Sequence, residues 1–276
     1  AQTLAGCDTD GDQPLVIVAA PAGGVRAAYW AASALEALFP TECARRNLFA
    51  VSGVSGGSVG TTLWTAHHGT AVSSEELVNQ LSGDEALASA LAGMFLRDLP
   101  QPLTGITDSW RDRAALMEDG WIEQTGVLGT VDSPLMWPDL ALPGNWNPVL
   151  VLNSSSVTEG CRILISNVDQ LTSESPAGCL SAPGPSSSFN SNSVSRAAID
   201  PLPMASADSC DSRAPLAVSA ALLSARFPLV TPSGSVHYCS GDSPRVTYGV
   251  DGGYYENSGL LSAIEISEGI ATLVEE

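Results

Sequence analysis

The residues with the clearest chemical potential lie in one stretch of small residues, Gly53-Val-Ser55-Gly-Gly57. This stretch follows the apolar run 48–51 and precedes the helix-like run 57–67. A serine on a tight strand-to-helix turn exposes its hydroxyl, and flanking glycines leave room for a neighbouring strand and for substrate. The first amides of the following helix favour negative charge beside the serine oxygen. The pattern predicts a nucleophile elbow with Ser55 as the nucleophile, although small residues also form ordinary turns.

A second glycine loop, Pro21-Ala-Gly-Gly-Val-Arg26, lies earlier in the chain. It follows the β-branched apolar run 14–20, which is typical of a buried parallel strand, and precedes the alanine-rich segment 27–39, a predicted buried helix. The dinucleotide fingerprint needs a third glycine where Ala27 stands, and the Walker pattern is absent, so no nucleotide cofactor is predicted. Free backbone amides at a helix start suit an oxyanion hole.

A carboxylate follows an apolar strand near the other end of the chain. The run 245–250 is strand-like and leads into Asp251-Gly-Gly253. A serine hydroxyl needs a neighbouring base, and an aspartate held between a strand end and glycines can take and return its proton. Asp251 is therefore the candidate base, and the alternative is that Asp-Gly-Gly only turns the chain.

Histidine offers a second candidate base. His67 and His68 lie on the predicted elbow helix at least three turns beyond Ser55, roughly 18 Å along its axis, and are expected to be solvated. His237 falls in the turn-rich stretch 233–241, which predicts a loop. A Ser-His-Asp triad with His237 as its base remains open, and its third member would be Asp169 or Asp200.

The remaining segments supply the frame for these residues. Helical spacing predicts helices over 75–99, with a Ser73 capping box, and over 110–124. Strands are predicted at 149–153 and 162–166, joined by a hairpin-like turn. The polar stretch 173–195 predicts a surface loop, and two helices are expected at the ranges 215–223 and 259 onward. With neither a repeat nor a linker, residues 1–276 are read as a single domain.

Three motifs in this order, Gly23-Gly-Val-Arg26, Gly53-Val-Ser-Gly-Gly57 and Asp251-Gly-Gly253, resemble those of the patatin-like phospholipases and their relatives among cytosolic phospholipases. Further stretches resemble the bacterial branch of the family, at 91–99, 112–121, 149–167 and 251–259. The resemblance implies a three-layer α/β/α fold with a central, mainly parallel sheet. Ala22 stands where the family often has a first glycine, and it still offers its amide.

The same resemblance implies the chemistry. Ser55 and Asp251 would form a Ser-Asp dyad, and the oxyanion site would consist of Gly23, Gly24 and Arg26. The implied activity is lipolytic acyl-ester hydrolysis through an acyl-enzyme, on a lipid or small acyl-ester substrate and without a cofactor. Two alternatives stay open, a Ser-His-Asp esterase and a catalytically silent module that holds a lipid.

The charge balance limits the partners. The chain of 276 residues carries 30 acidic and 11 basic residues, all of the latter arginine, for a formal net charge of −19. Without a basic patch to neutralise phosphates, nucleic acid is not an expected partner. Tight docking on anionic lipid is disfavoured for the same reason, which leaves transient contact with a membrane surface. A hydrophobic content of 44% is sufficient for a full α/β core.

The chain has six cysteines, spread without a C-x-x-C pair or a histidine cluster, so no metal site is predicted. An even, dispersed set predicts at least two disulfides, and local pairing would join Cys161 to Cys179 and Cys210 to Cys239. The alternative is six buried free thiols. Disulfides favour a secreted, periplasmic or membrane-associated protein over a cytoplasmic one.

Overall fold

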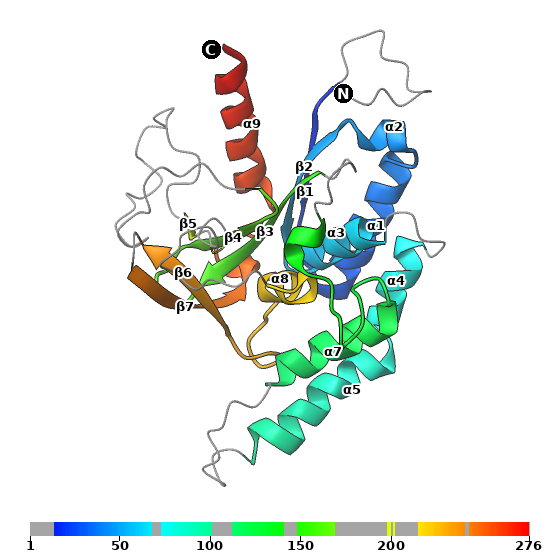
Figure 1. Ribbon diagram of the computed structural model, residues 1–276, viewed down its shortest axis with the longest axis vertical. Coiled ribbons are helices and arrows are strands. Elements are labelled where there is room, and N and C mark those ends of the chain that lie inside the picture. The colour runs from blue at the N-terminus through cyan, green and yellow to red at the C-terminus, as the bar shows by residue number, and fades with distance from the viewer. Residues whose placement is uncertain are drawn as a thin grey trace.

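The computed structural model describes residues 14–67, 73–100, 112–140, 148–168, 198–199, 201, 215–240 and 243–275. In these parts the chain forms a mixed α/β structure around a central, mainly parallel sheet with helices beside it (Figure 1), as the sequence predicts. Five strands follow one another across the sheet: β1 (Val16–Ala20), β2 (Leu48–Val54), β3 (Val149–Ser156), β4 (Arg162–Ser166) and β5 (Ala198–Ile199). Two more complete it, β6 (Gly234–Ser240) and β7 (Ser243–Asp251).

The parallel part of the sheet carries the two glycine loops. β1, β2 and β3 are parallel neighbours, so β1 and β2 end at the same edge and deliver their following loops there. β4 returns antiparallel to β3, which confirms the predicted hairpin. β2 is buried along almost its whole length, which explains its continuous apolar sequence.

β3 pairs with two strands in succession along one of its edges. Residues 149–153 pair with β2, and residues 154–156 pair with the antiparallel strand β7. β4 takes the opposite edge, because it pairs with residues 151–155 of β3. In register, Val54 lies opposite Asn153 and Asp251 lies opposite Ser154. The carboxyl ends of β2 and β7 therefore meet end to end beside β3.

Helices follow the strands as predicted, with some changes in extent. Helix α1 (Gly24–Leu38) begins inside the glycine loop, three residues before the predicted start, and α3 (Gly56–Ala66) begins directly after Ser55. The other helices close to their predicted positions are α7 (Arg113–Thr125), α8 (Ala217–Ser224) and α9 (Leu260–Glu275). Short helical turns occur at α2 (Glu42–Arg45), η2 (Trp137–Leu140) and η5 (Gly252–Tyr254).

Two sequence predictions of secondary structure are wrong. The expected helix over 75–99 is divided into α4 (Ser74–Leu81), α5 (Asp84–Gly93) and the π-helical turn η1 (Met94–Asp98). Ser82 is the C-cap of α4 and Gly83 is the N-cap of α5. The Ser73 cap is confirmed, because its hydroxyl accepts a hydrogen bond from the Glu76 amide. The expected loop at 233–241 contains β6, whose pairing with β7 outweighs its turn-rich composition. The predicted loop 173–195 lies outside the described residues.

Helices cover both faces of the sheet. Neighbouring residues of β2 point to opposite sides: Ser52 faces Gly259 at the start of α9, and Gly53 faces Ser58 in α3. α1 and α4 pack on the face of the sheet that α3 covers, whereas α9 contacts β1 and β2 on the opposite face. This arrangement is compatible with a three-layer α/β/α fold.

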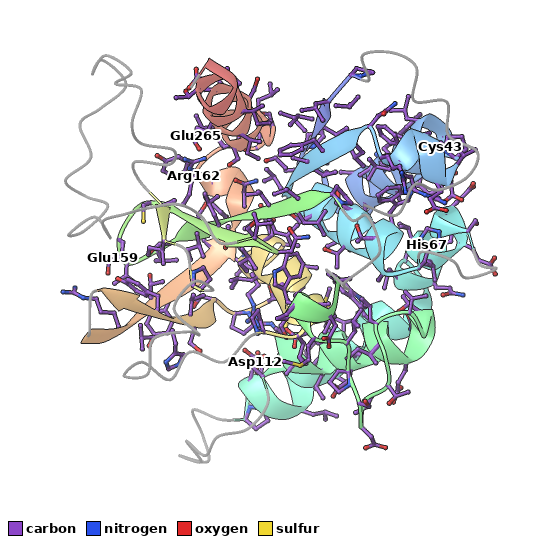
Figure 2. All side chains as sticks on the ribbon, turned by 45° about the horizontal axis from the view of Figure 1, so that its top comes forward. Cys43, His67, Asp112, Glu159, Arg162 and Glu265 are labelled. Atoms are coloured by element: carbon purple, nitrogen blue, oxygen red, sulfur yellow. The ribbon has the colours of Figure 1, made fainter. Side chains whose placement is uncertain are left out.

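A buried ion pair attaches α9 to the sheet. The guanidinium of Arg162, on β4 and 2% exposed, makes two hydrogen bonds to the Glu265 carboxylate at 2.7 and 2.8 Å (Figure 2). It also donates to the Ser262 hydroxyl at 2.9 Å. A buried charge needs such compensation, and this contact fixes the start of α9 relative to β3 and β4.

Two of the six cysteines, Cys43 on α2 and Cys161 before β4, are disulfide-bonded. The pairings expected from sequence involve Cys179, Cys210 and the side chain of Cys239, which lie outside the described residues. The prediction of at least two disulfides therefore stays a prediction. In the part of the chain that is described, no helix has the length and apolar content needed to cross a membrane.

Candidate active site

Ser55 occupies the sharp turn between β2 and α3. Its backbone has φ 52° and ψ −122°, a conformation that residues with a side chain rarely adopt. Such strain costs on the order of 1–3 kcal/mol and persists only where the surroundings enforce it. Ser55 is 6% exposed and stands at the N-cap of α3, where the first helical amides are free to bind negative charge.

The carboxylate of Asp251 lies against the Ser55 hydroxyl. Ser55 Oγ donates a hydrogen bond of 2.5 Å to Asp251 Oδ2, between residues 196 positions apart. Asp251 is 5% exposed, and its other oxygen, Oδ1, accepts a hydrogen bond from the Gly253 amide at 2.8 Å. Its own amide donates to the Arg226 carbonyl at 2.9 Å. The carboxylate is thus oriented at both oxygens, with Oδ2 directed at the serine.

Close backbone approach explains the glycines of the elbow. A Cβ at Gly56 would lie 1.9 Å from the Gly24 carbonyl oxygen, and one at Gly57 would lie 2.2 Å from that of Ala20. Gly60, one turn further, lies equally close to the Ala28 carbonyl. α3 therefore packs directly against the end of β1 and against α1, with no side chain between them.

Two of the three threonines of α3 lower the cost of burying this helix, because their hydroxyls bond back to its own carbonyls. Thr61 Oγ1 donates to the Gly57 carbonyl at 2.7 Å, and Thr65 Oγ1 donates to the Thr61 carbonyl at 2.9 Å. Hydroxyls that bond back to their own helix need no partner elsewhere. The elbow helix can therefore lie in the core although its sequence is rich in polar small residues.

The predicted oxyanion loop lies beside the elbow. Gly23 and Gly24 have φ values of 148° and 62°, and α1 begins at Gly24 without a side-chain cap. Since Gly24 abuts Gly56, the amino-terminal ends of α1 and α3 converge on Ser55, and both favour negative charge there. Arg26 is an exposed residue of the first turn of α1. The amides of this turn are available to an oxyanion, because a helix leaves its first donors unpaired.

Ser224, at the end of α8, stabilises the strained turn at Ser55 through hydrogen bonds. Its hydroxyl accepts the Ser55 amide at 2.9 Å and donates to the Asn153 carbonyl at 2.5 Å. Ser58 Oγ lies 2.8 Å from the same oxygen. Because a hydroxyl has one proton to give and the Asn153 carbonyl takes it, Ser58 is the donor in this contact. Ser224 is therefore fully bonded, and the Ser55 amide is not left unpaired in the core.

Asn153 connects the elbow to the opposite layer. Its side-chain amide donates to Ser52 Oγ at 3.0 Å and to the Gly53 carbonyl at 2.8 Å. Its Oδ1 accepts a hydrogen bond from Ser262 of α9 at 2.6 Å, and Ser262 is itself bonded to Arg162. Neither Asn153 nor Ser224 was predicted from the sequence as part of the site. The available signal for Asn153 was a run of polar residues, 153–156, at the end of an otherwise apolar strand.

The histidines do not reach this site in the described structure. His237 is exposed on β6 and pairs with Val246, five residues before Asp251, which is about 16 Å along the strand. His67 is 7% exposed, which corrects the expectation of a solvated side chain. Its Nδ1 lies 2.8 Å from the Trp64 carbonyl and its Nε2 lies 3.7 Å from Glu36. His68, Asp169 and Asp200 lie outside the described residues.

Removing the Ser224 hydroxyl tests its positioning role. Ser224→Ala leaves the Ser55 amide without its acceptor, so we expect unfolding free energy to fall by about 1–3 kcal/mol. Turnover of the ester substrates expected from the sequence should fall by roughly tenfold to a hundredfold, since the strained turn can relax. Ser219→Ala, on the same helix, removes a hydroxyl bonded to Glu118 at 2.7 Å and should leave turnover within about twofold. Equal losses in both variants would show that Ser224 acts only through the stability of α8.

Comparison with known proteins gives no further guide to identity: no family model matches the sequence, and no curated protein matches it. Within the described residues, no three His, Cys, Asp or Glu side chains are grouped so as to hold a metal ion.

Proposed function

We propose that this protein is a serine hydrolase of carboxylic esters that uses a Ser55–Asp251 dyad. The observation that carries the proposal is the 2.5 Å hydrogen bond from Ser55 Oγ to Asp251 Oδ2 at a strained strand-to-helix turn. A nucleophile bonded to a base that is itself oriented by a third group is the expected arrangement for covalent catalysis. The Gly253 amide provides that orientation.

The chemistry follows from these contacts. As Ser55 Oγ attacks the acyl carbon, its proton moves to Asp251 Oδ2, and the carbonyl electron pair moves onto oxygen. The amides of Gly23 and Gly24 and the helix ends of α1 and α3 stabilise the oxyanion. The intermediate collapses, the bond to the alcohol breaks, and Asp251 returns the proton to the leaving oxygen. Water then attacks the acyl-enzyme and gives its proton to Asp251. The bond between the acyl carbon and Ser55 Oγ breaks, Asp251 returns the proton to Ser55 Oγ, and the free acid leaves.

The three motifs and the mixed α/β frame together support a place among the patatin-like phospholipases. A Ser-His-Asp esterase has less support, because His237 is far from the dyad along β7. A silent lipid-binding module would need neither the strain at Ser55 nor an oriented carboxylate. The proposed substrates are lipids or small acyl esters, the reaction needs no cofactor, and contact with a membrane surface is transient.

Covalent labelling tests the proposal. A fluorophosphonate probe should add one adduct to the wild type, seen by intact mass spectrometry, and none to Ser55→Ala. The wild type should also hydrolyse p-nitrophenyl acetate and butyrate. A folded wild type that neither labels nor turns over these esters would favour the silent lipid-binding module.

The charge of −19 sets the expected order of lipid substrates. Repulsion from anionic lipid acts within a Debye length of about 8 Å at physiological salt. Zwitterionic vesicles should therefore be hydrolysed faster than anionic ones at low salt, and added salt should narrow the difference. Fastest hydrolysis on anionic vesicles, slowed by salt, would contradict this order.

A further inference from the structure

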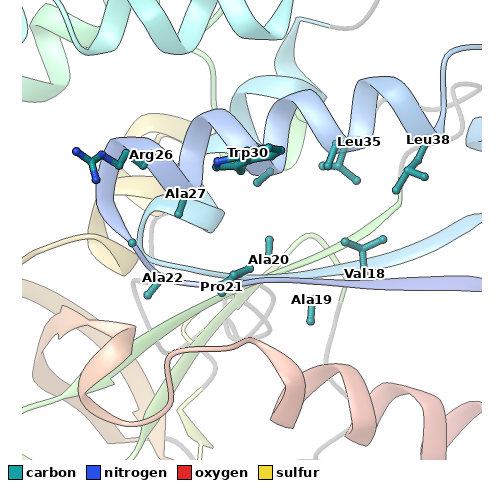
Figure 3. A pocket seen from close by; sticks show the side chains of 13 residues that line it. Val18, Ala19, Ala20, Pro21, Ala22, Arg26, Ala27, Trp30, Leu35 and Leu38 are labelled. Carbon is teal, nitrogen blue, oxygen red and sulfur yellow. The ribbon is translucent and has the colours of Figure 1, made fainter.

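An apolar groove runs along the outer side of β1, between this strand and α1 (Figure 3). Its volume is about 450 Å³, within the range of small-molecule sites. Val18 and Ala20 contribute from the strand, and Leu35 and Leu38 from the helix. Arg26 is the only charged residue among those that line it. The groove therefore suits a ligand with little polar surface.

Large apolar side chains stand exposed along the groove. Trp30 and Leu38 of α1 are 71% and 64% exposed, although both line it. Figure 3 shows them spaced along α1, which lies above β1 in this view. Exposed apolar side chains that gather around a hollow indicate a binding site more than isolated ones do.

The groove is continuous with the candidate active site. Ala22, Gly23 and Arg26 line one end of it and also belong to the oxyanion loop. Gly24, which follows Gly23 in that loop, abuts Gly56 of the elbow. Ala22 lies beside Gly253. A ligand in the groove thus has one end next to both halves of the site.

The shape of the groove is linear. It extends along α1 from Arg26 to Leu38, which at 1.5 Å per residue is roughly 18 Å. We propose that this groove binds the acyl chain of the ester substrate, with the carbonyl at the Gly23 end and the methyl end near Leu38. The assignment rests on the proposed hydrolase function and adds to it the part of the substrate that determines specificity.

Chain-length dependence is the first expected result. From p-nitrophenyl acetate to octanoate, kcat/KM should rise about twofold for each added methylene. Full burial of a methylene would give roughly fourfold, but the groove is open on one side.

A pair of matched variants tests the groove directly. Ala34→Trp fills its middle at an exposed position of α1, whereas Ala37→Trp adds the same side chain to an exposed position of the same helix outside the lining. We expect Ala34→Trp to lower kcat/KM for octanoate by about tenfold and to change acetate turnover by less than about twofold. Ala37→Trp should leave both esters unaffected. An unchanged chain-length profile in Ala34→Trp would overturn the proposal.

A binding measurement separates the groove from catalysis. Laurate should bind Ser55→Ala, with its carboxylate at the Arg26 end, and calorimetry should show at least about tenfold weaker binding when Ala34→Trp is added. If the wild type turns over no ester yet laurate binding responds in this way, the hydrolase proposal fails and the groove remains. Equal binding by both variants, or none, would exclude the groove as an acyl site.

Discussion

Ser55→Ala and Asp251→Asn are each expected to lower ester turnover by about three orders of magnitude or more. Neither residue can act alone, because the Ser55 hydroxyl needs a base to take its proton and Asp251 serves as that base for this hydroxyl. Asp251→Asn keeps the size of the side chain but removes the charge that accepts the proton. The measurement is kcat/KM on p-nitrophenyl butyrate with purified variants whose folding is checked by circular dichroism.

Two further variants complete the dyad test. The double variant should be no slower than the slower single one, because the two residues work as a unit. His237→Ala should cost less than about tenfold, or about 1.4 kcal/mol of transition-state stabilisation. An inactive His237→Ala beside a largely active Asp251→Asn would replace the dyad with a triad.

Gly56→Ala is expected to have the next largest effect. The new Cβ would lie 1.9 Å from the Gly24 carbonyl oxygen, a backbone atom that cannot move without its loop. On helix propensity alone this change stabilises by about 1 kcal/mol, whereas the clash should destabilise by about 1–3 kcal/mol. Displacement of the oxyanion loop by about 1 Å would lower turnover by roughly a hundredfold.

Gly120→Ala is the matched control for this change. Gly120 lies inside α7, and a Cβ there would meet only the flexible side chain of Ser89, with its nearest atom at 3.0 Å. It should leave turnover unchanged and keep or raise the free energy of unfolding, measured by urea denaturation. A Gly56→Ala variant that is more stable and fully active would mean that α1 and α3 are not held in close contact.

Much of the frame was predictable because its signals are local. The apolar runs before each glycine loop predicted β1 and β2, and the small residues after them predicted a tight turn into α3. The alanines after residue 24 predicted α1, and the apolar strand before Asp251 predicted β7. In each case the residues that form the strand or helix and the residues that end it are neighbours in the sequence. The order strand, glycine loop, helix predicted an α/β unit, whereas the mainly parallel central sheet was implied by the resemblance and is what the structure has.

Other features depended on partners far away in sequence. The pairing of β6 with β7 went against the turn-rich local pattern, since the packing of two separate strands decided it. His67 lies at the end of the elbow helix, where a solvated side chain is expected. The structure instead buries it beside Trp64 and Glu36. No local feature of the sequence could reveal these contacts.

For the candidate site, the sequence by itself determined which side chains are available: a serine between glycines after one strand and an aspartate before glycines after another. Only the tertiary structure decided that they meet, because β2 and β7 end against each other along a single edge of β3. It also supplied Ser224 and Asn153, whose hydrogen bonds hold the Ser55 turn from α8 and β3. The physical reason is that strand pairing joins residues 196 positions apart, over which periodicity and spacing carry no information.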